Sequence, residues 1–329
     1  MIASNPIAAR PARDDDRPAV LDLLQASLGW DLASGLAEYF AWKHLANPFG
    51  RSPAWVALDG ERIVGFRTFL RWEFETPAGE VLTAVRAVDT ATHPEYQGRG
   101  IFRLLTLAAV EAMTAEGVDF VFNTPNDQSR PGSLKMGWQV VGRPVASVRV
   151  RSPQGLLRML TSRVPADRWP QPGSPGSSAI ELFADARVDA LLDARAGARG
   201  LRTRRTRPYL AWRYGFAPLG YRALTAGADP AEGIAVFRVR RRGRASEAAL
   251  CEVIVPAGSA RAAGHLARAV ARTTGADYVV RLGPASVSAG YLPLPRQGPI
   301  LTWRRLATAA TTPPPRSAWQ LSLGDVELL

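Results

Sequence analysis

The chain has 329 residues, of which 47% are hydrophobic and 21% charged, and this composition excludes a disordered protein. Because one compact core rarely needs so many residues, we expect two domains. No apolar run reaches the roughly 18 residues of a membrane span, and residues 1–20 lack the apolar stretch of a secretory signal. We therefore expect a cytoplasmic protein with no membrane partner.

The formal net charge of +12 comes almost entirely from arginine, since Lys43 and Lys135 are the only lysines among 41 basic residues. The densest basic clusters, at 202–207 and 238–244, lack the interleaved aromatic residues that stack on bases, so we consider a nucleic-acid partner unlikely. A basic surface would instead attract an anionic cofactor or substrate. The single cysteine, Cys251, lies in an apolar run and is expected to be buried and inert.

The first 150 residues alternate helical and strand-like patterns. Apolar spacing predicts helices at 19–28, 36–45 and 101–116, and the last of these ends at Gly117. Strand-like runs occupy 54–58, 62–70, 81–92, 119–123, 138–142 and 145–150, and the first two are joined by Asp59-Gly60, a hairpin signal. This order predicts a mixed α/β layer architecture, an α+β fold with a mixed sheet.

Residues 151–178 interrupt this pattern, and their Pro/Gly/Ser-rich end, PQPGSPGSS, is typical of a linker. The pattern then begins again. Five short segments of the first half recur in the same order in the second half, the clearest being Tyr39–Lys43 against Tyr209–Arg213. We therefore expect a duplicated fold, with a first domain at 1–150, a linker at 151–178 and a second domain at 179–329.

The segment 87–105, AVDTATHPEYQGRGIFRLL, places a strand, a proline turn, a glycine-rich turn and a helix in succession. Backbone N–H groups of such a turn, together with the positive end of the helix dipole, form a cradle for an anion. Glycine lets the backbone close on a bulky diphosphate. A turn that uses glycine only for its geometry is the structural alternative, and this segment matches neither a Rossmann fingerprint nor a P-loop.

The segment 93–101, HPEYQGRGI, resembles the acetyl-CoA pyrophosphate signature Q/R-x-x-G-x-G/A of the GNAT acetyltransferases. The family's second signature, N-x-x-A…Y-x-x-x-G-F, is similar in spacing to five downstream residues: Asn126, Ser129, Ser133, Gly137 and Trp138. The resemblance covers about residues 7–150. It implies two tandem GNAT-like acyl-CoA N-acyltransferase folds, of which the second is degenerate because 254–260 has lost the Q-x-x-G pattern.

The resemblance also implies a set of cofactor contacts. Main-chain amides of the glycine turn would hold the pyrophosphate, the end of the preceding strand would pair with the pantetheine arm as an added strand, and the later loop would contact the cofactor. These residues are Thr90, Ala91, Thr92, Gln97, Gly98, Arg99, Gly100, Ile101, Phe102, Asn126 and Ser129. Phe102 departs from the Gly or Ala of the family's pattern.

For catalysis, the sequence suggests Asp89 as the base because it lies in the strand expected beside the acetyl group. His93 and Asp127 are alternatives, although shaping or capping a loop is the simpler role for each. Ser133 replaces the tyrosine that often acts as the family's general acid, so Ser133 or a water molecule is the candidate acid. No metal-ligand spacing occurs, so no metal is expected.

The aromatic residues Trp42, Trp72 and Trp138 are candidates for an acceptor pocket, with packing as the alternative. The expected reaction is direct transfer of acetyl from acetyl-CoA, or of another acyl group, to the primary amine of a small metabolite. Two alternatives stay open: a non-catalytic GNAT-like scaffold that binds CoA or another ligand, and an aminoacyl transferase acting on a cell-wall precursor. The sequence leaves the acceptor, acyl length and oligomeric state undetermined.

Overall fold

The computed structural model describes residues 6–29, 35–195, 199–283, 287–308 and 310–326. The chain forms two compact units, and neither is a continuous stretch of sequence. The first unit comprises residues 1–74, 82–142 and 300–314, and the second comprises residues 75–81, 143–299 and 315–329.

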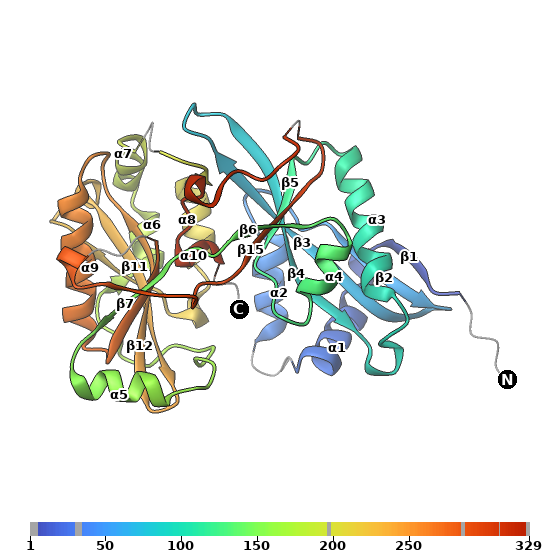
Figure 1. Ribbon diagram of the computed structural model, residues 1–329, viewed down its shortest axis with the longest axis horizontal. Coiled ribbons are helices and arrows are strands. Elements are labelled where there is room, and N and C mark those ends of the chain that lie inside the picture. Colours follow the sequence, from blue (N-terminus) through green and yellow to red (C-terminus); the bar gives the residue numbers. More distant parts are fainter. Residues whose placement is uncertain (1–5, 30–34, 196–198, 284–286, 309, 327–329) are drawn as a thin grey trace. The chain divides into compact units, whose positions relative to one another are not determined.

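The first unit is a twisted sheet with helices on both of its faces (Figure 1). Its strands lie in the order β1-β2-β3-β4-β5-β15-β6. Their bounds are Ala8–Pro11, Ala54–Asp59, Arg62–Glu75, Val81–Thr92, Phe120–Asn123, Leu301–Arg305 and Gln139–Gly142. The helices are α1 (Arg17–Leu28), α2 (Leu36–Leu45), α3 (Ile101–Ala115) and α4 (Arg130–Lys135).

Helix α3 is held close against the sheet by an apolar face that includes Ile101, Leu105 and Ala109. A methyl group at Gly65 of β3 would overlap the Ile101 side chain, so glycine at this position permits the close approach. Burial of these side chains fixes the N-terminus of α3 at the end of β4.

The second unit repeats the strand order of the first. Its sheet runs β8-β10-β11-β12-β13-β7-β14. In the first sheet, β5 pairs parallel with β4 and antiparallel with β15. In the second sheet, β13 pairs parallel with β12 and antiparallel with β7, so β12 and β13 correspond to β4 and β5. The strand bounds are Ser177–Ser178, Arg222–Thr225, Ile234–Arg242, Ala245–Ile254, Tyr278–Leu282, Ala146–Val150 and Leu292–Leu294.

The helices of the second unit are α5 to α10. They span Pro153–Thr161, Ala179–Ala184, Arg187–Asp193, Arg207–Tyr214, Ala260–Thr274 and Leu323–Val326. Helix α5 lies within the segment predicted as linker. The short strand β9 (Arg202–Thr203) precedes α8. Near the C-terminus, Asp325 of α10 accepts a hydrogen bond from the buried Arg205, so this part of the tail packs on the second unit.

The chain passes from one sheet to the other between consecutive strands, so each sheet contains a strand that follows a strand of the other sheet. Strand β15, which follows the second unit's β14, lies between β5 and β6 of the first sheet. Strand β7, which follows β6, lies between β13 and β14 of the second sheet. The symmetry of this exchange supports the predicted duplication, which remains an inference, as do the linear boundaries at 150 and 178.

Candidate functional site

The glycine-rich turn between β4 and α3 is built on a firm base. After β4, residues Pro94–Tyr96 form a 3-10 turn, and the Tyr96 hydroxyl donates to the Asp59 carboxylate at 2.7 Å. His93 contacts Arg62 across its Nε2 atom at 2.9 Å. The β2–β3 hairpin therefore holds the turn in place through Asp59 and Arg62.

Gly98 and Gly100 both have left-handed backbone conformations, with φ of +77° and +79°. A Cβ atom at either position would meet no heavy atom within 4 Å, so these glycines are required by backbone geometry and the space above the turn is open. Within the described chain, the amides of Gly98 to Phe102 have no recorded hydrogen-bond acceptor. Free amides at the start of a 15-residue helix form an anion-binding site.

Strand β4 separates from β5 just before this turn. The two strands pair only at Ala84–Arg86 with Phe120–Phe122, although β4 continues to Thr92. The segment 90–92 therefore has an open side where an extended ligand can add as a strand. At the end of β4, the Ser27 hydroxyl of α1 donates to the Thr92 carbonyl at 3.1 Å.

A cavity of about 490 Å³ lies over the turn and the end of β4. It is lined by Ser27, Leu28, Thr90, Ala91, Thr92, Tyr96, Gln97, Gly98, Gly100, Ile101, Phe102 and Gln128. The structure thus brings together eight of the predicted cofactor residues. Ser27, Leu28, Tyr96 and Gln128 were not predicted, and the two from α1 could not have been, because no local pattern links α1 to a strand more than 60 residues later.

Three predicted cofactor residues lie apart from this cavity lining. Arg99 turns back over the Tyr96 ring, with its guanidinium carbon 4.6 Å from the ring centroid. Asn126 accepts hydrogen bonds at its Oδ1 atom from the amide and the hydroxyl of Ser129, both at 2.9 Å. This pair therefore stabilises the loop just before α4, a local role that the spacing alone did not reveal.

Asp89 faces α2, not open solvent. Its Oδ2 atom lies 2.7 Å from the Lys43 ammonium and 2.8 Å from Nε2 of His44. Burial alone would raise the pKa of Asp89, but the Lys43 charge and the His44 hydrogen bond outweigh it and hold that pKa well below its usual range. Asp89 also has a left-handed φ of +42°, a strained conformation for a non-glycine residue.

The ionised Asp89 fixes the tautomer of His44. Nε2 carries the proton that it donates to the carboxylate, which leaves Nδ1 to accept from the Ser52 hydroxyl at 3.0 Å. Burial lowers the pKa of His44, against the opposing effect of Asp89, so the ring is neutral near pH 7. The unprotonated Nδ1 atom of His44 therefore faces Ser52, away from β4.

Ser133, the predicted acid, is buried in α4 and donates to the Ser129 carbonyl at 3.1 Å. Of the alternative bases, His93 contacts Arg62 and accepts weakly from the Glu95 amide, while Asp127 is exposed and pairs with Arg130 at 2.8 Å. Both have the structural roles that the sequence suggested as alternatives.

The three tryptophans pack mainly on other aromatic or charged groups. Trp72 and Trp138 are buried in the first unit, Trp72 against Phe122 and Trp138 beneath the Arg304 guanidinium. Trp42, half-buried, contacts Tyr39. These contacts correspond to the packing alternative.

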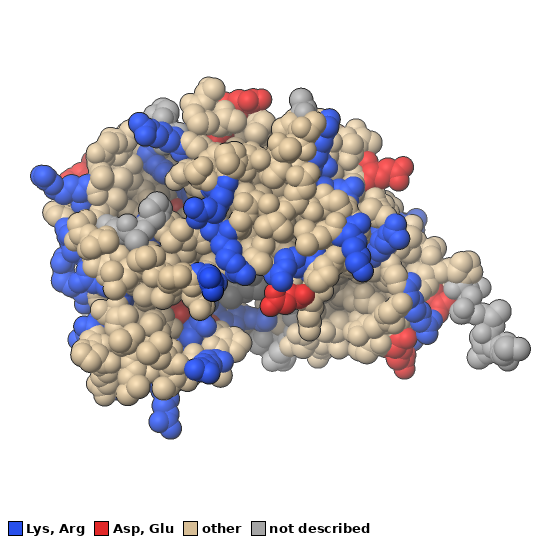
Figure 2. Space-filling model, in the orientation of Figure 1, with Lys and Arg blue, Asp and Glu red and all other residues tan. Residues whose placement is uncertain are grey.

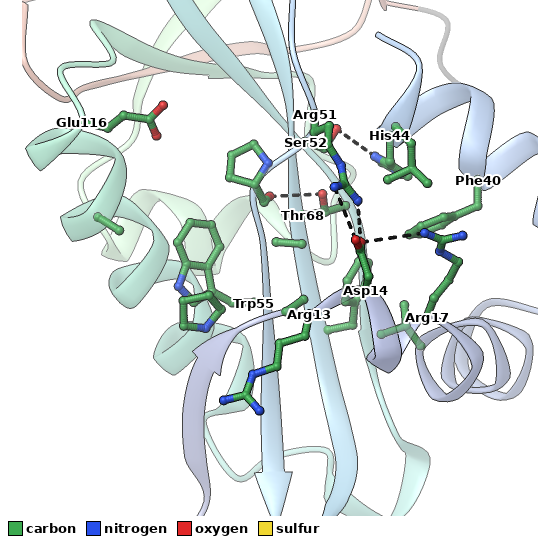
Figure 3. Close-up of a pocket in the computed structure, with 18 residues that line it drawn as sticks. Arg13, Asp14, Arg17, Phe40, His44, Arg51, Ser52, Trp55, Thr68 and Glu116 are labelled. Carbon is green, nitrogen blue, oxygen red and sulfur yellow. Dashed lines mark hydrogen bonds and ion pairs between the residues drawn. The ribbon is translucent and has the colours of Figure 1, made fainter.

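A second cavity of the first unit, about 500 Å³, lies at the start of β2 (Figure 3). Arg51 and Arg17 converge on Asp14 at its rim, and Phe40 and Trp55 supply apolar wall. His44 and Ser52 also line it, so the hydrogen-bonded chain from Asp89 ends at this cavity. Its lining shares no residue with the cavity over the glycine turn.

The corresponding turn of the second unit is closed by its own hydrogen bonds. Before α9, the amide of Ala257 donates to Ala194, that of Ser259 to Pro256 and that of Ala260 to Gly258. Three amides of this turn are therefore satisfied by backbone carbonyls, unlike those of Gly98 to Phe102 in the first unit. In the same unit Cys251 is 1% exposed, as expected of an inert thiol.

Residues 8–141 match the family model of the acetyltransferase (GNAT) domain. Over these residues the chain is similar to the GNAT family. No curated protein matches the sequence significantly. The domain match begins at β1 and ends at β6, so it contains the whole glycine turn and both signature segments.

Solved structures resemble nearly the whole chain at low identity. A probable N-acyltransferase of unknown function from Enterococcus faecalis V583 has a TM-score of 0.64 at 13% identity, covering 92% of this chain and 73% of its own. GCN5-related N-acetyltransferases from Kribbella flavida and Anabaena variabilis ATCC 29413 give TM-scores of 0.61 and 0.65 at 14% and 12% identity. They cover 93% and 92% of this chain, and 73% of each neighbour. At such identity the likeness establishes the fold.

In the part of the chain that the structure describes, no helix is long and apolar enough to cross a bilayer. No group of three or more His, Cys, Asp or Glu side chains in that part is arranged to hold a metal ion.

Proposed function

We propose that the protein is an acyl-CoA-dependent N-acyltransferase, transferring acetyl or a related acyl group to the primary amine of a small molecule. The observation that carries this proposal is the open turn at Gly98–Gly100, whose free amides begin α3 beside the unpaired end of β4. The GNAT domain at 8–141 supports the reaction class. The amine acceptor and the acyl length are left open.

In this proposal the turn amides bind the donor's diphosphate, and the open side of 90–92 pairs with its pantetheine arm. Holding a thioester beside an amine can supply several kcal/mol of the barrier reduction, about 7–11 in favourable intramolecular systems. A backbone N–H of β4 polarises the thioester carbonyl. The amine nitrogen attacks the carbonyl carbon, the C–S bond breaks, and CoA leaves as the thiolate.

The geometry favours a positioning role for Asp89. A carboxylate whose pKa lies well below the usual range is a poor acceptor for an amine proton, and Lys43 and His44 already occupy its Oδ2 atom. We infer that this buried pair maintains the strained backbone at the point where β4 leaves β5. The amine proton passes to water, and the thiolate leaves without help from Ser133, whose hydroxyl is engaged by Ser129.

The test is calorimetric titration of the full chain with acetyl-CoA. Gly98→Ala with Gly100→Ala replaces two left-handed glycines and should weaken binding at least tenfold, because the strained turn no longer aligns its amides. Gly117→Ala is the matched control: its φ is +88°, its surroundings are equally open, and it follows the other end of α3. Equal binding by the wild type and the double variant would refute the cradle.

Turnover separates the enzyme from its alternatives. Release of CoA thiol in the presence of a panel of small amines supports the transferase, whereas tight binding without turnover of any amine supports a scaffold. Acceptance of aminoacyl donors instead of acetyl-CoA would favour the aminoacyl transferase. A nucleic-acid function is less favoured, since the basic clusters at 202–207 and 238–244 lack interleaved aromatic residues. On the face drawn in Figure 2, basic side chains lie among many uncharged atoms.

A further inference from the structure

Arg67 is a buried cation on strand β3 of the first unit. It is 4% exposed and extends from β3 between two aromatic rings, with its guanidinium carbon 5.0 Å from the centroid of Phe69 and 4.9 Å from that of Phe102. Its Nη1 atom donates to the Thr90 hydroxyl. Its Nε atom is buried without a hydrogen-bond partner in the described chain.

Two other buried arginine side chains have carboxylate partners. Arg205 is bound by the carboxylates of Glu252 and Asp325, and Arg240 by that of Glu247. No carboxylate of the described residues forms an ion pair with Arg67, and burial lowers its pKa to about 9, which leaves it charged at neutral pH. A buried charge with no counter-charge raises the free energy of the folded protein, so an anion supplied by a ligand would lower that free energy.

Two of the three partners of this guanidinium line the cavity over the glycine turn. Thr90 belongs to the open end of β4, and Phe102 belongs to the first turn of α3. No aspartate or glutamate lines that cavity, so nothing in its lining neutralises the cation. Asp89, which precedes Thr90 on β4, is held by Lys43 and His44.

From these contacts we propose that Arg67 is the counter-charge for the diphosphate of the bound acyl-CoA donor. This inference rests on the proposed function and adds a side chain to a cradle otherwise made of amides. The contact with Phe102 favours the diphosphate over the acyl end, because it places the guanidinium beside the helix turn that carries the free amides.

The proposal also accounts for the bulky residue at the sixth position of the signature. The Phe102 ring lies between the Arg67 guanidinium and α4, where a Cβ atom on Gly132 would come within 3.0 Å of it. With Phe69 on its other side, the cation is shielded from water by two rings. A charge in such surroundings attracts a phosphate more strongly than a hydrated surface arginine does.

The experiment compares Arg67→Met with Arg67→Lys by calorimetry, using CoA and pantetheine as ligands of the full chain. CoA carries the diphosphate, whereas pantetheine lacks every phosphate. We expect Arg67→Met to raise the Kd for CoA about tenfold or more and Arg67→Lys to restore most of it, while the Kd for pantetheine is unchanged by both. Inorganic pyrophosphate should raise the melting temperature of the wild type more than that of Arg67→Met.

Three results would overturn the inference. Unchanged CoA affinity in Arg67→Met removes Arg67 from donor binding. An equal loss for CoA and pantetheine assigns it a structural role. A loss seen with succinyl-CoA but not with acetyl-CoA moves the charge to a carboxylate of the acyl group. Failure of the proposed function looks different, because the wild type itself would then bind no CoA. If Arg67→Met does not fold, Arg67→Gln provides the same comparison.

Discussion

At the scale of single residues, the candidate site combines a turn that the sequence identifies with a buried ion pair that it does not. The Gln97–Gly100 turn is local, so its glycines and the following helix are visible in consecutive residues. Asp89 and its partners lie 45 or more positions apart, and strand alternation cannot decide which face of β4 a side chain occupies. Arg67 could not be predicted for the same reason, since its contacts come from β4 and α3.

The first residue-scale prediction concerns Lys43. Lys43→Met removes the ammonium and leaves the Asp89 carboxylate buried with only His44 as partner. We expect the free energy of unfolding to fall by about 3–5 kcal/mol, the usual cost of an uncompensated buried charge, measured by urea denaturation. The pair Lys43→Met with Asp89→Asn should recover part of this loss. A single-variant effect below about 1 kcal/mol would mean that the ion pair is not what holds β4 here.

The second prediction concerns pH. Because the pKa of His44 is lowered in the folded protein, protonation favours the unfolded chain once the pH falls below the ordinary histidine value of about 6.5. Stability should therefore decrease as the pH is lowered from about 6.5. His44→Gln keeps a donor to Asp89 but cannot titrate, so the slope of melting temperature against pH over this range should become flatter. An unaltered slope would assign the effect to other groups.

At the scale of elements, apolar periodicity defines α2 and β4 with the same bounds in sequence and structure, 36–45 and 81–92. Helix α5 was predicted as linker because proline and glycine dominate the end of that segment, although its start, at Ser152, caps a helix through the Gly155 amide. The contrast between α3 and α9 matters most for function. The two helices are both 15 residues long, but the amides of Ala257, Ser259 and Ala260 before α9 bond to carbonyls, whereas those of Gly98 to Phe102 before and in the first turn of α3 do not.

This contrast predicts a single donor site in each chain. Titration with acetyl-CoA should saturate at one ligand per protein molecule. Gly258→Ala alters a left-handed glycine, φ +80°, in the turn before α9, and should leave the affinity within about twofold of the wild type because the amides of Ala257, Ser259 and Ala260 already bond to carbonyls. Two equivalent sites, or a loss in Gly258→Ala comparable to that in the Gly98 and Gly100 variant, would contradict it.

At the scale of the whole molecule, the sequence indicated two copies of one pattern but not the exchange of strands between them. Repeated segments such as 39–43 and 209–213 predict the two copies, and each of the two segments lies in a helix, α2 and α8. The placement of Leu301–Arg305 beside Phe120–Asn123 depends on pairing across about 180 residues, which no local periodicity encodes.

The exchange predicts that residues 1–150 do not fold on their own. Without β15, the edges of β5 and β6 are left unpaired in the middle of a sheet. We expect a chain of residues 1–150 to be aggregated or unfolded by circular dichroism. A chain in which a glycine-serine linker joins residues 1–142 to residues 300–314 restores all seven strands and should give cooperative melting. Cooperative melting of the shorter chain would show that β15 is dispensable.

The late position of Leu301–Arg305 has a consequence for synthesis on the ribosome. The gap between β5 and β6 cannot be filled until residues 143–299 have also been translated, so the sheet that residues 1–142 begin stays incomplete during that time. During that interval two strand edges are exposed to other nascent chains. Chaperone dependence in the cell would follow from the order in which this protein is made, even if the finished molecule were highly stable.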